Sequence, residues 1–151
     1  HSVIPSICRA TYDRRLLPGE TIDDVLTPIH AAASAAQITL NATIGTGSYQ
    51  TFTGRTLVKE KFFPAWLLPE DDAFVRSAQA GLTSIGLPAT TKAYRFCTNA
   101  AYSAGVAGIP TIGFGPATEA DAHVINERLA IDDLLTAAKG YAAIIDALLI
   151  D

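Results

Sequence analysis

The sequence is poor in sulfur: it has no methionine and only two cysteines, Cys8 and Cys97. These two lie far apart and form no CxxC pair, which excludes a disulfide-dense framework. We therefore expect two free thiols in a reducing compartment and a cytoplasmic protein. No charged stretch followed by an apolar one opens the chain, so we expect no secretory signal in it. A start at His1 without an initiator methionine is expected of a processed product or of a piece of a longer chain.

Long hydrophobic runs and a basic stripe are missing as well. The longest apolar runs, such as residues 142–150, are broken by Asp146 and are shorter than the roughly 20 residues of a bilayer-spanning helix. The formal net charge of −4 gives the phosphates of a nucleic acid little to bind. The 151 residues, 49% of them hydrophobic, are enough to bury roughly 70% of the unfolded surface in one domain or two small lobes. We expect a soluble protein that binds neither a membrane nor a nucleic acid.

The first third of the chain predicts a strand, a helix and a second strand. Residues 7–15 alternate in part and are expected to be extended. A helix is expected over 21–36, because Thr21 and Asp24 approximate a capping box and apolar residues recur on one face. Residues 38–44 alternate between apolar and polar side chains, which predicts a half-buried strand.

The rest of the chain predicts a crossing segment and then alternating helices and strands, so that the fold class is mixed α/β (α+β). The crossing segment, residues 51–69, contains the only tryptophan and suits neither a helix nor a strand. The elements expected after it are a helix at 70–85, a strand at 92–97, a short helix at 99–106, a strand at 110–114 and a helix at 132–149. The side chains expected to face inward on the last helix are Leu134, Leu135, Ala138, Tyr141, Ala142, Ile145 and Leu148.

The stretch 105–127 carries the clearest indication of a functional site. A short apolar strand is expected to lead into the turn Gly113–Pro116, and a lone histidine, His123, follows in a polar segment. Ligands bind beyond the carboxyl ends of strands in open α/β sheets, and glycine lets a backbone approach a ligand closely. Asp121 and Glu127 are near enough in sequence to orient the imidazole of His123. The turn does not complete a nucleotide-binding GxGxxG motif, and one histidine alone makes no catalyst.

Longer motifs, spread over nearly the whole chain, accompany this candidate site. The second half contains YRFCTNAAYSAGVAGIPTIGFGP, then AHVINE, then IDDLLTAAKGYAAII. In this order they resemble the carboxy-terminal segment of the zinc metallohydrolase family of acetylornithine deacetylase, succinyl-diaminopimelate desuccinylase and carboxypeptidase-like enzymes. The front segment IPSICRATYDRRLLPGETIDDVL is similar to the end of that family's lid, or dimerisation, domain, and KFFPAWLLPEDD resembles the return into its catalytic domain. The resemblance implies a partial lid at 1–50, a crossing segment at 51–69 and the last part of the catalytic domain at 70–151.

The resemblance also implies an activity, the hydrolysis of an amide bond in an N-acyl amino acid or a small peptide. Two zinc ions, with cobalt or manganese as possible substitutes, would activate a bridging water, and a glutamate would act as general base. His123 matches the last metal ligand of the family, and Glu127 matches the acidic residue that supports this ligand. The positions that match substrate-binding residues are Asn99, Gly115, Pro116, Arg14 and Arg15. For the two arginines, an ion pair with Asp13 or Glu20 is the alternative to a clamp on a substrate carboxylate.

The chain departs from the family in the rest of the metal site. The other ligands lie on an HxD motif, a bridging aspartate and a paired glutamate motif, none of which is present, and a catalytic zinc needs about three protein ligands. We therefore expect a missing amino-terminal catalytic portion as a partner, an inactive chain on its own and a homodimer formed through the lid. Ala100 and Ala117 replace family glycines, and Ser2 replaces an asparagine that reaches the partner's site. The alternative is a non-catalytic binding or oligomerisation module whose exposed sheet edge pairs with a second copy.

Overall fold

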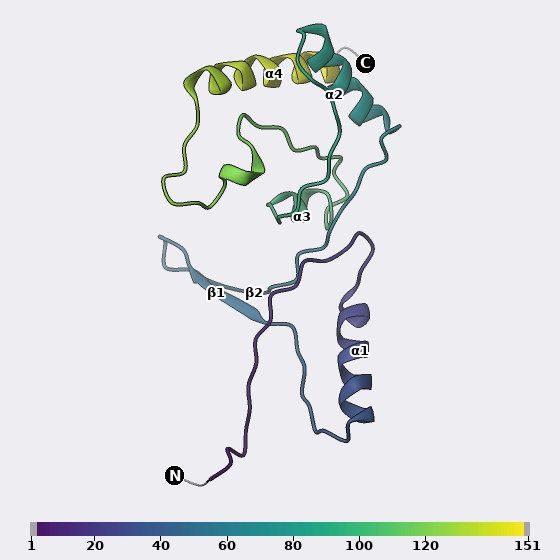
Figure 1. Ribbon diagram of the computed structural model, residues 1–151, viewed down its shortest axis with the longest axis vertical. Helices are drawn as coiled ribbons and strands as arrows, with labels where there is room; N and C mark the ends of the chain where they lie inside the picture. The colour runs from purple at the N-terminus through teal and green to yellow at the C-terminus, as the bar shows by residue number, and fades with distance from the viewer. Residues whose placement is uncertain (1–2, 150–151) are drawn as a thin grey trace.

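The structure is a computed structural model that describes residues 3–149, and it has the expected mixed α+β class. Figure 1 shows α1, β1 and β2 toward the end of the molecule that carries the N-terminus, with α2 and α4 at the opposite end. Ser2 lies outside the described residues. The elements are α1 (Ile22–Ala35), β1 (Thr46–Gln50), β2 (Thr56–Glu60), α2 (Ala73–Ser84), α3 (Ala100–Ser103), the 3₁₀ turn η1 (Glu119–Asp121) and α4 (Ile131–Leu149).

Helix α1 begins with the capping box expected from the sequence. The Thr21 hydroxyl accepts a hydrogen bond from the Asp24 N–H at 3.2 Å, and the Asp24 carboxylate accepts one from the Thr21 N–H at 2.8 Å. Two of the N–H groups that a helix start leaves unpaired are satisfied in this way. No residue of α1 is buried, and in residues 3–149 the helix packs against no other helix or strand. Its apolar face is therefore available to another chain segment.

Strands β1 and β2 form an antiparallel hairpin whose register places Thr46 opposite Glu60. The connecting turn is closed by two backbone bonds: the Thr51 N–H donates to the Arg55 carbonyl at 2.8 Å, and the Gly54 N–H donates to the Thr51 carbonyl at 2.9 Å. Gly54 has a φ of 84°, which glycine adopts at no steric cost. The second strand therefore lies in the crossing segment, where the sequence predicted neither helix nor strand, and that prediction was wrong.

Four further strand predictions, at 7–15, 38–44, 92–97 and 110–114, were wrong as well. None of these segments has regular secondary structure, and the one sheet in the described part of the chain is the β1–β2 hairpin. A strand needs a neighbour to accept and donate its ladder hydrogen bonds, and these segments find none among residues 3–149. The short helix expected at 99–106 is present as the single turn α3.

The core lies where α2 packs against α4. The Asp72 carboxylate caps α2 by accepting from the Phe74 N–H at 2.9 Å, which confirms the helix expected at 70–85. The two helices cross closely, because a Cβ added to Gly81 would lie 2.4 Å from the Ala143 carbonyl oxygen. Small residues on both helices thus allow the two backbones to approach this closely. The buried apolar side chains of the described chain are Val75, Ala78, Leu82, Ala101, Ala137 and Ile144.

Helix α4 was predicted correctly, but its inward face was not. The buried residues are Ala137, Gly140 and Ile144, whereas Leu134 and Leu135 are 53% and 57% exposed. Glycine and alanine face α2 because the close approach of the two backbones leaves no room for a leucine. Most of the larger apolar side chains of α4 are consequently left uncovered. Those expected inside but found exposed are Leu134, Leu135, Ala138, Tyr141, Ala142 and Ile145, while Leu148 is half-buried.

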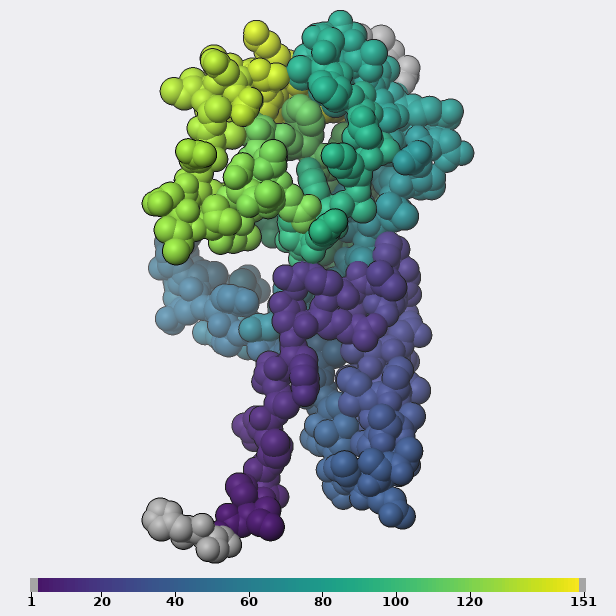
Figure 2. All heavy atoms as spheres, in the orientation of Figure 1, coloured from purple at the N-terminus to yellow at the C-terminus, as the bar shows by residue number. Residues whose placement is uncertain are grey.

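The chain exposes far more surface than a compact protein of its size. Its accessible area is 12514 Å², whereas a monomeric globular protein of 15.9 kDa exposes about 7,400 Å². No side chain in residues 3–149 is completely buried. Figure 2 shows the open arrangement on one face, with the N-terminal segment extending along the lower part of the molecule. Among the described residues, no helix has both the length and the apolar character that crossing a bilayer requires.

Candidate functional site

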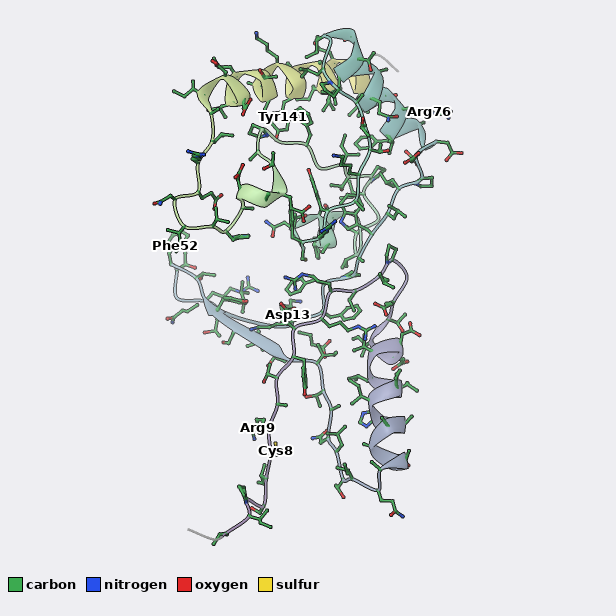
Figure 3. The ribbon with its side chains drawn as sticks, in the orientation of Figure 1. Cys8, Arg9, Asp13, Phe52, Arg76 and Tyr141 are labelled. Atoms are coloured by element: carbon green, nitrogen blue, oxygen red, sulfur yellow. The ribbon has the colours of Figure 1, made fainter. Side chains whose placement is uncertain are left out.

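Residues 113–116, predicted as a turn and called the turn below, have no hydrogen bond among the described residues that closes a turn, and the chain bends at Pro116 and Ala117; this segment is anchored on α4 by Tyr141. The Tyr141 hydroxyl donates to the carbonyl oxygen of Phe114 at 2.6 Å, and the two rings pack edge to face with centroids 5.2 Å apart. Figure 3 shows Tyr141 extending from α4 toward the chain beneath the helix. An edge-to-face pair and a hydrogen bond from one side chain fix both the ring and the backbone of Phe114. The turn is therefore held in a defined position although it contains two glycines.

The other side of the turn is held by Tyr94. A Cβ on Gly113 would lie 2.1 Å from a ring carbon of Tyr94, so the ring rests directly on this glycine. Tyr94 is stacked on Phe96 with centroids 4.8 Å apart. Burial, followed by the neighbouring Tyr141 and Glu119, raises the pKa of Tyr94 above its ordinary 10.0, so the phenol stays neutral at physiological pH. The turn thus lies between two tyrosines from distant parts of the sequence.

His123 lies after η1 with its side chain exposed. Its φ is 60°, an uncommon left-handed conformation for a residue other than glycine. The backbone N–H of His123 donates to the Glu127 carboxylate at 3.0 Å. Glu127 therefore acts on the backbone that presents the histidine, and no hydrogen bond to the imidazole occurs within residues 3–149. The ring is free to bind a group from outside this part of the chain.

The described residues do not form a metal site by themselves. Nowhere in residues 3–149 do three histidine, cysteine, aspartate or glutamate side chains come together to hold an ion. Zinc in proteins takes four ligands in structural sites and about three protein ligands in catalytic ones. His123 accordingly fits a metal only as one ligand among others that lie elsewhere.

Asn99 lines a cavity of about 500 Å³ next to α3. Its backbone starts the helical turn, while its side chain makes no capping hydrogen bond and is exposed. The amide is thus available to a ligand in the cavity. The cavity does not include Gly115, Pro116 or His123, so Asn99 is separate from the turn. Its lining residues are Phe63, Cys97, Thr98, Asn99, Ala101 and Tyr102; the sequence reasoning did not identify Phe63 or Tyr102, whose aromatic character alone does not distinguish them from packing residues.

The arginine pair before α1 is engaged in exposed ion pairs. Arg14 pairs with Glu20, and one guanidinium nitrogen of Arg15 donates to both carboxylate oxygens of Asp13 at 2.7 and 2.8 Å. The Leu17 N–H, and after it Arg14, lower the pKa of Glu20 below its ordinary 4.5. These contacts correspond to the alternative role of the arginines expected from the sequence.

Comparison with known proteins places these features in a family. A profile of the peptidase family M20/M25/M40 matches residues 16–147. The chain is similar to the uncharacterised protein YgeY of Escherichia coli strain K12 and to the protein of the same name in strain O157:H7. Each is 36% identical over 142 residues, which cover 91% of this chain and 34% of the relative. The chain thus spans about a third of the length of these relatives, and no solved structure matches it.

The family profile covers helix α1. It also covers the turn at residues 113–116, His123 and most of α4. The same segments carry the motifs from which the sequence predicted a metallohydrolase. The chain therefore belongs to the peptidase family M20/M25/M40.

Proposed function

We propose that this chain is the carboxy-terminal part of a metal-dependent hydrolase that cleaves an amide bond in an N-acyl amino acid or a small peptide. The observation that carries this proposal is the match to a peptidase family over residues 16–147. Two zinc ions per complete site are the proposed metals, with cobalt or manganese as substitutes. The two exposed, free cysteines are compatible with a reducing compartment, which supports a location in the cytoplasm.

His123 is the metal ligand that this chain contributes. Its imidazole is exposed and has no hydrogen-bond partner among residues 3–149, while its backbone is held by Glu127. A ligand of this kind needs a fixed position and a free ring nitrogen, and the histidine has both. The remaining ligands have to come from another portion of the enzyme, because the described chain brings no such set together.

The missing portion is also needed to cover apolar surface. The accessible area exceeds that of a compact protein of this mass by about 5,000 Å², which is as large as an obligate interface. Leu134, Leu135 and Ile145 form an exposed apolar face on α4, beside the turn that α4 anchors. The amino-terminal catalytic portion is the proposed partner of this face. A second copy of the lid is the proposed partner of α1 and of the free edges of the hairpin.

The substrate is proposed to lie between the turn and the lid. Gly115 and Pro116 allow its close approach, Asn99 offers an amide at the cavity beside α3, and Arg14 and Arg15 offer guanidinium groups. To bind a substrate carboxylate, Arg15 would have to leave the exposed Asp13 carboxylate, an exchange that costs little in water, and Arg14 would have to leave the partly buried Glu20 carboxylate.

A second candidate function is a non-catalytic oligomerisation module. It is favoured by α1, which has no buried residue and no packing partner in the described chain, and by the hairpin with its two unpaired edges. Such a module would dimerise through these elements without needing a metal. The two functions therefore differ in their dependence on metal and on the rest of the protein.

The deciding experiment compares the protein encoded by the full reading frame with the 151-residue chain. Both are assayed with zinc, cobalt or manganese against a panel of N-acyl amino acids and dipeptides. We expect metal-dependent hydrolysis by the full-length protein and none by the chain alone. A full-length protein that binds no metal and hydrolyses nothing, yet dimerises, would establish the module instead. Turnover by the chain alone would contradict the view that its site is incomplete.

A further inference from the structure

Helix α4 contacts the turn through two consecutive residues, Gly140 and Tyr141. A Cβ on Gly140 would lie 2.6 Å from the ring of Phe114, so the ring lies directly on the helix backbone. Tyr141 then closes over the same residue, with its ring edge to face and its hydroxyl on the Phe114 carbonyl oxygen. Gly140 and Tyr141 therefore pack around the ring of Phe114 and fix the direction of its carbonyl group.

Fixing this carbonyl also fixes the N–H of the next residue. The Phe114 carbonyl and the Gly115 N–H belong to one planar peptide group, and in a trans peptide they point in opposite directions. There is no cis peptide bond in the described chain. The hydrogen bond from Tyr141 to the carbonyl thus turns the Gly115 N–H away from the hydroxyl. That N–H has no acceptor within residues 3–149, and its successor Pro116 has no N–H to offer.

The space around Gly115 is open. A Cβ there would meet nothing nearer than the Tyr141 hydroxyl at 4.0 Å, whereas Cβ atoms on Gly113 and Gly140 would clash with aromatic rings. Gly113 and Gly140 are therefore glycines for packing, but Gly115 is not. A bare backbone with a fixed, unpaired N–H and open space in front of it suits a ligand that approaches closely and accepts a hydrogen bond.

We propose that Tyr141 is a positioning residue that orients the Gly115 N–H to bind a carboxylate oxygen of the substrate. This inference rests on the proposed hydrolase function and adds the chemical group that the turn recognises. Tyr94 supports the arrangement from the other side, because its ring packs against Gly113. What remains for Tyr141 to restrict is rotation of the peptide group between Phe114 and Gly115. A hydrogen bond from an N–H to an anionic oxygen is shorter and stronger than one to a neutral acceptor. The affinity for a carboxylate therefore depends on the orientation of the Gly115 N–H.

The test uses full-length protein with Tyr141→Phe, which keeps the ring contact with Phe114 and removes only the hydroxyl. The control is Tyr49→Phe on β1, whose side chain is 61% exposed. Each variant is assayed with a substrate that has a free carboxylate and with the corresponding carboxamide. We expect Tyr141→Phe to raise KM for the carboxylate about tenfold, with kcat nearly unchanged, and to raise KM for the carboxamide less, because its neutral oxygen accepts a weaker hydrogen bond. Tyr49→Phe is expected to change neither value.

The amide NMR resonance of Gly115 provides a readout that does not depend on activity. In Tyr141→Phe, this resonance should shift and broaden relative to the wild type, because the peptide that carries it loses its anchor, while thermal stability stays close to that of the wild type. An active wild type with an unchanged KM in Tyr141→Phe, or equal KM increases for carboxylate and carboxamide, would overturn the inference alone. A wild type that hydrolyses nothing would overturn the proposed function, and an unchanged Gly115 amide resonance would show that the hydroxyl does not hold the peptide.

Discussion

Gly81→Ala is the most sensitive test of the α2–α4 contact, because two opposing effects of known size act at one position. In an isolated helix, replacing glycine by alanine stabilises by about 1 kcal/mol. Here the new Cβ would lie 2.4 Å from the carbonyl oxygen of Ala143 and 3.1 Å from the Cβ of Ala147. The nearest atom belongs to a helix backbone and cannot rotate away. The two helices therefore have to separate by roughly half an ångström or more, which is overpacking of the kind that costs about 1–3 kcal/mol.

The expected net effect is a loss of about 2 kcal/mol, because a backbone clash lies at the upper end of that range and propensity returns about 1 kcal/mol. For a chain of this length, the thermal midpoint should fall by about 4–8 °C. The assay is thermal unfolding followed by far-UV circular dichroism. Ala80→Gly is the matched control, because Ala80 is exposed on the same helix and reports propensity alone, with an expected loss of about 1 kcal/mol. A higher midpoint for Gly81→Ala would refute the close crossing of the helices.

Three further predictions concern the cap, the turn and the arginine pair. The Thr21 hydroxyl and then its N–H lower the pKa of Asp24 below its ordinary 3.8, so this carboxylate stabilises α1 above that pH and ceases to do so as the pH falls through the lowered pKa. Exchange of the first amides of α1 should accelerate in that acidic range, and Asp24→Asn should remove the dependence. Gly115→Ala should leave the thermal midpoint unchanged, since its Cβ meets open space, but should lower the activity of the full-length protein about tenfold; full activity would contradict a close substrate approach. Arg15→Ala should change stability by less than about 0.5 kcal/mol, because its ion pair with Asp13 is exposed, while raising KM for carboxylate substrates.

The helices were predictable because their signals are local. The Thr21–Asp24 capping box and the Asp72 cap lie within one turn of the residues they organise, and both are present. The buried face of α4 was harder to predict, because apolar residues occur on most sides of the helix. Its buried face is selected by Gly81 on another helix, a long-range contact that periodicity cannot contain.

The strand predictions were wrong for the same physical reason, namely that a strand depends on contacts distant in the sequence. Residues 38–44 have the alternation of a strand, but a strand forms only where a second segment completes its ladder. The hairpin was missed although it has a signal, namely a glycine in a short turn between two stretches rich in threonine, valine and tyrosine. The Thr51 and Gly54 bonds that close this turn could have been expected from that pattern.

The candidate site was predicted in its residues more than in its geometry. His123 and the Gly113–Pro116 turn were identified by motif, and the metal role of His123 stays a prediction. The left-handed backbone of His123 and its bond to Glu127 depend on the loop as folded and left no sequence signal. Tyr141 was taken for a core residue, because its helical spacing matched the apolar face. The glycine before it, which admits the ring of Phe114, was the available clue.

The most direct test of the central claim is the zinc content of the full-length protein with His123→Ala. His30→Ala is the control, because His30 is exposed on α1, away from the turn. We predict two zinc ions per wild-type and His30→Ala chain, and the loss of one ion together with most of the amide hydrolysis in His123→Ala. Full zinc content and activity in His123→Ala would contradict the assignment of His123 as the metal ligand that this chain supplies.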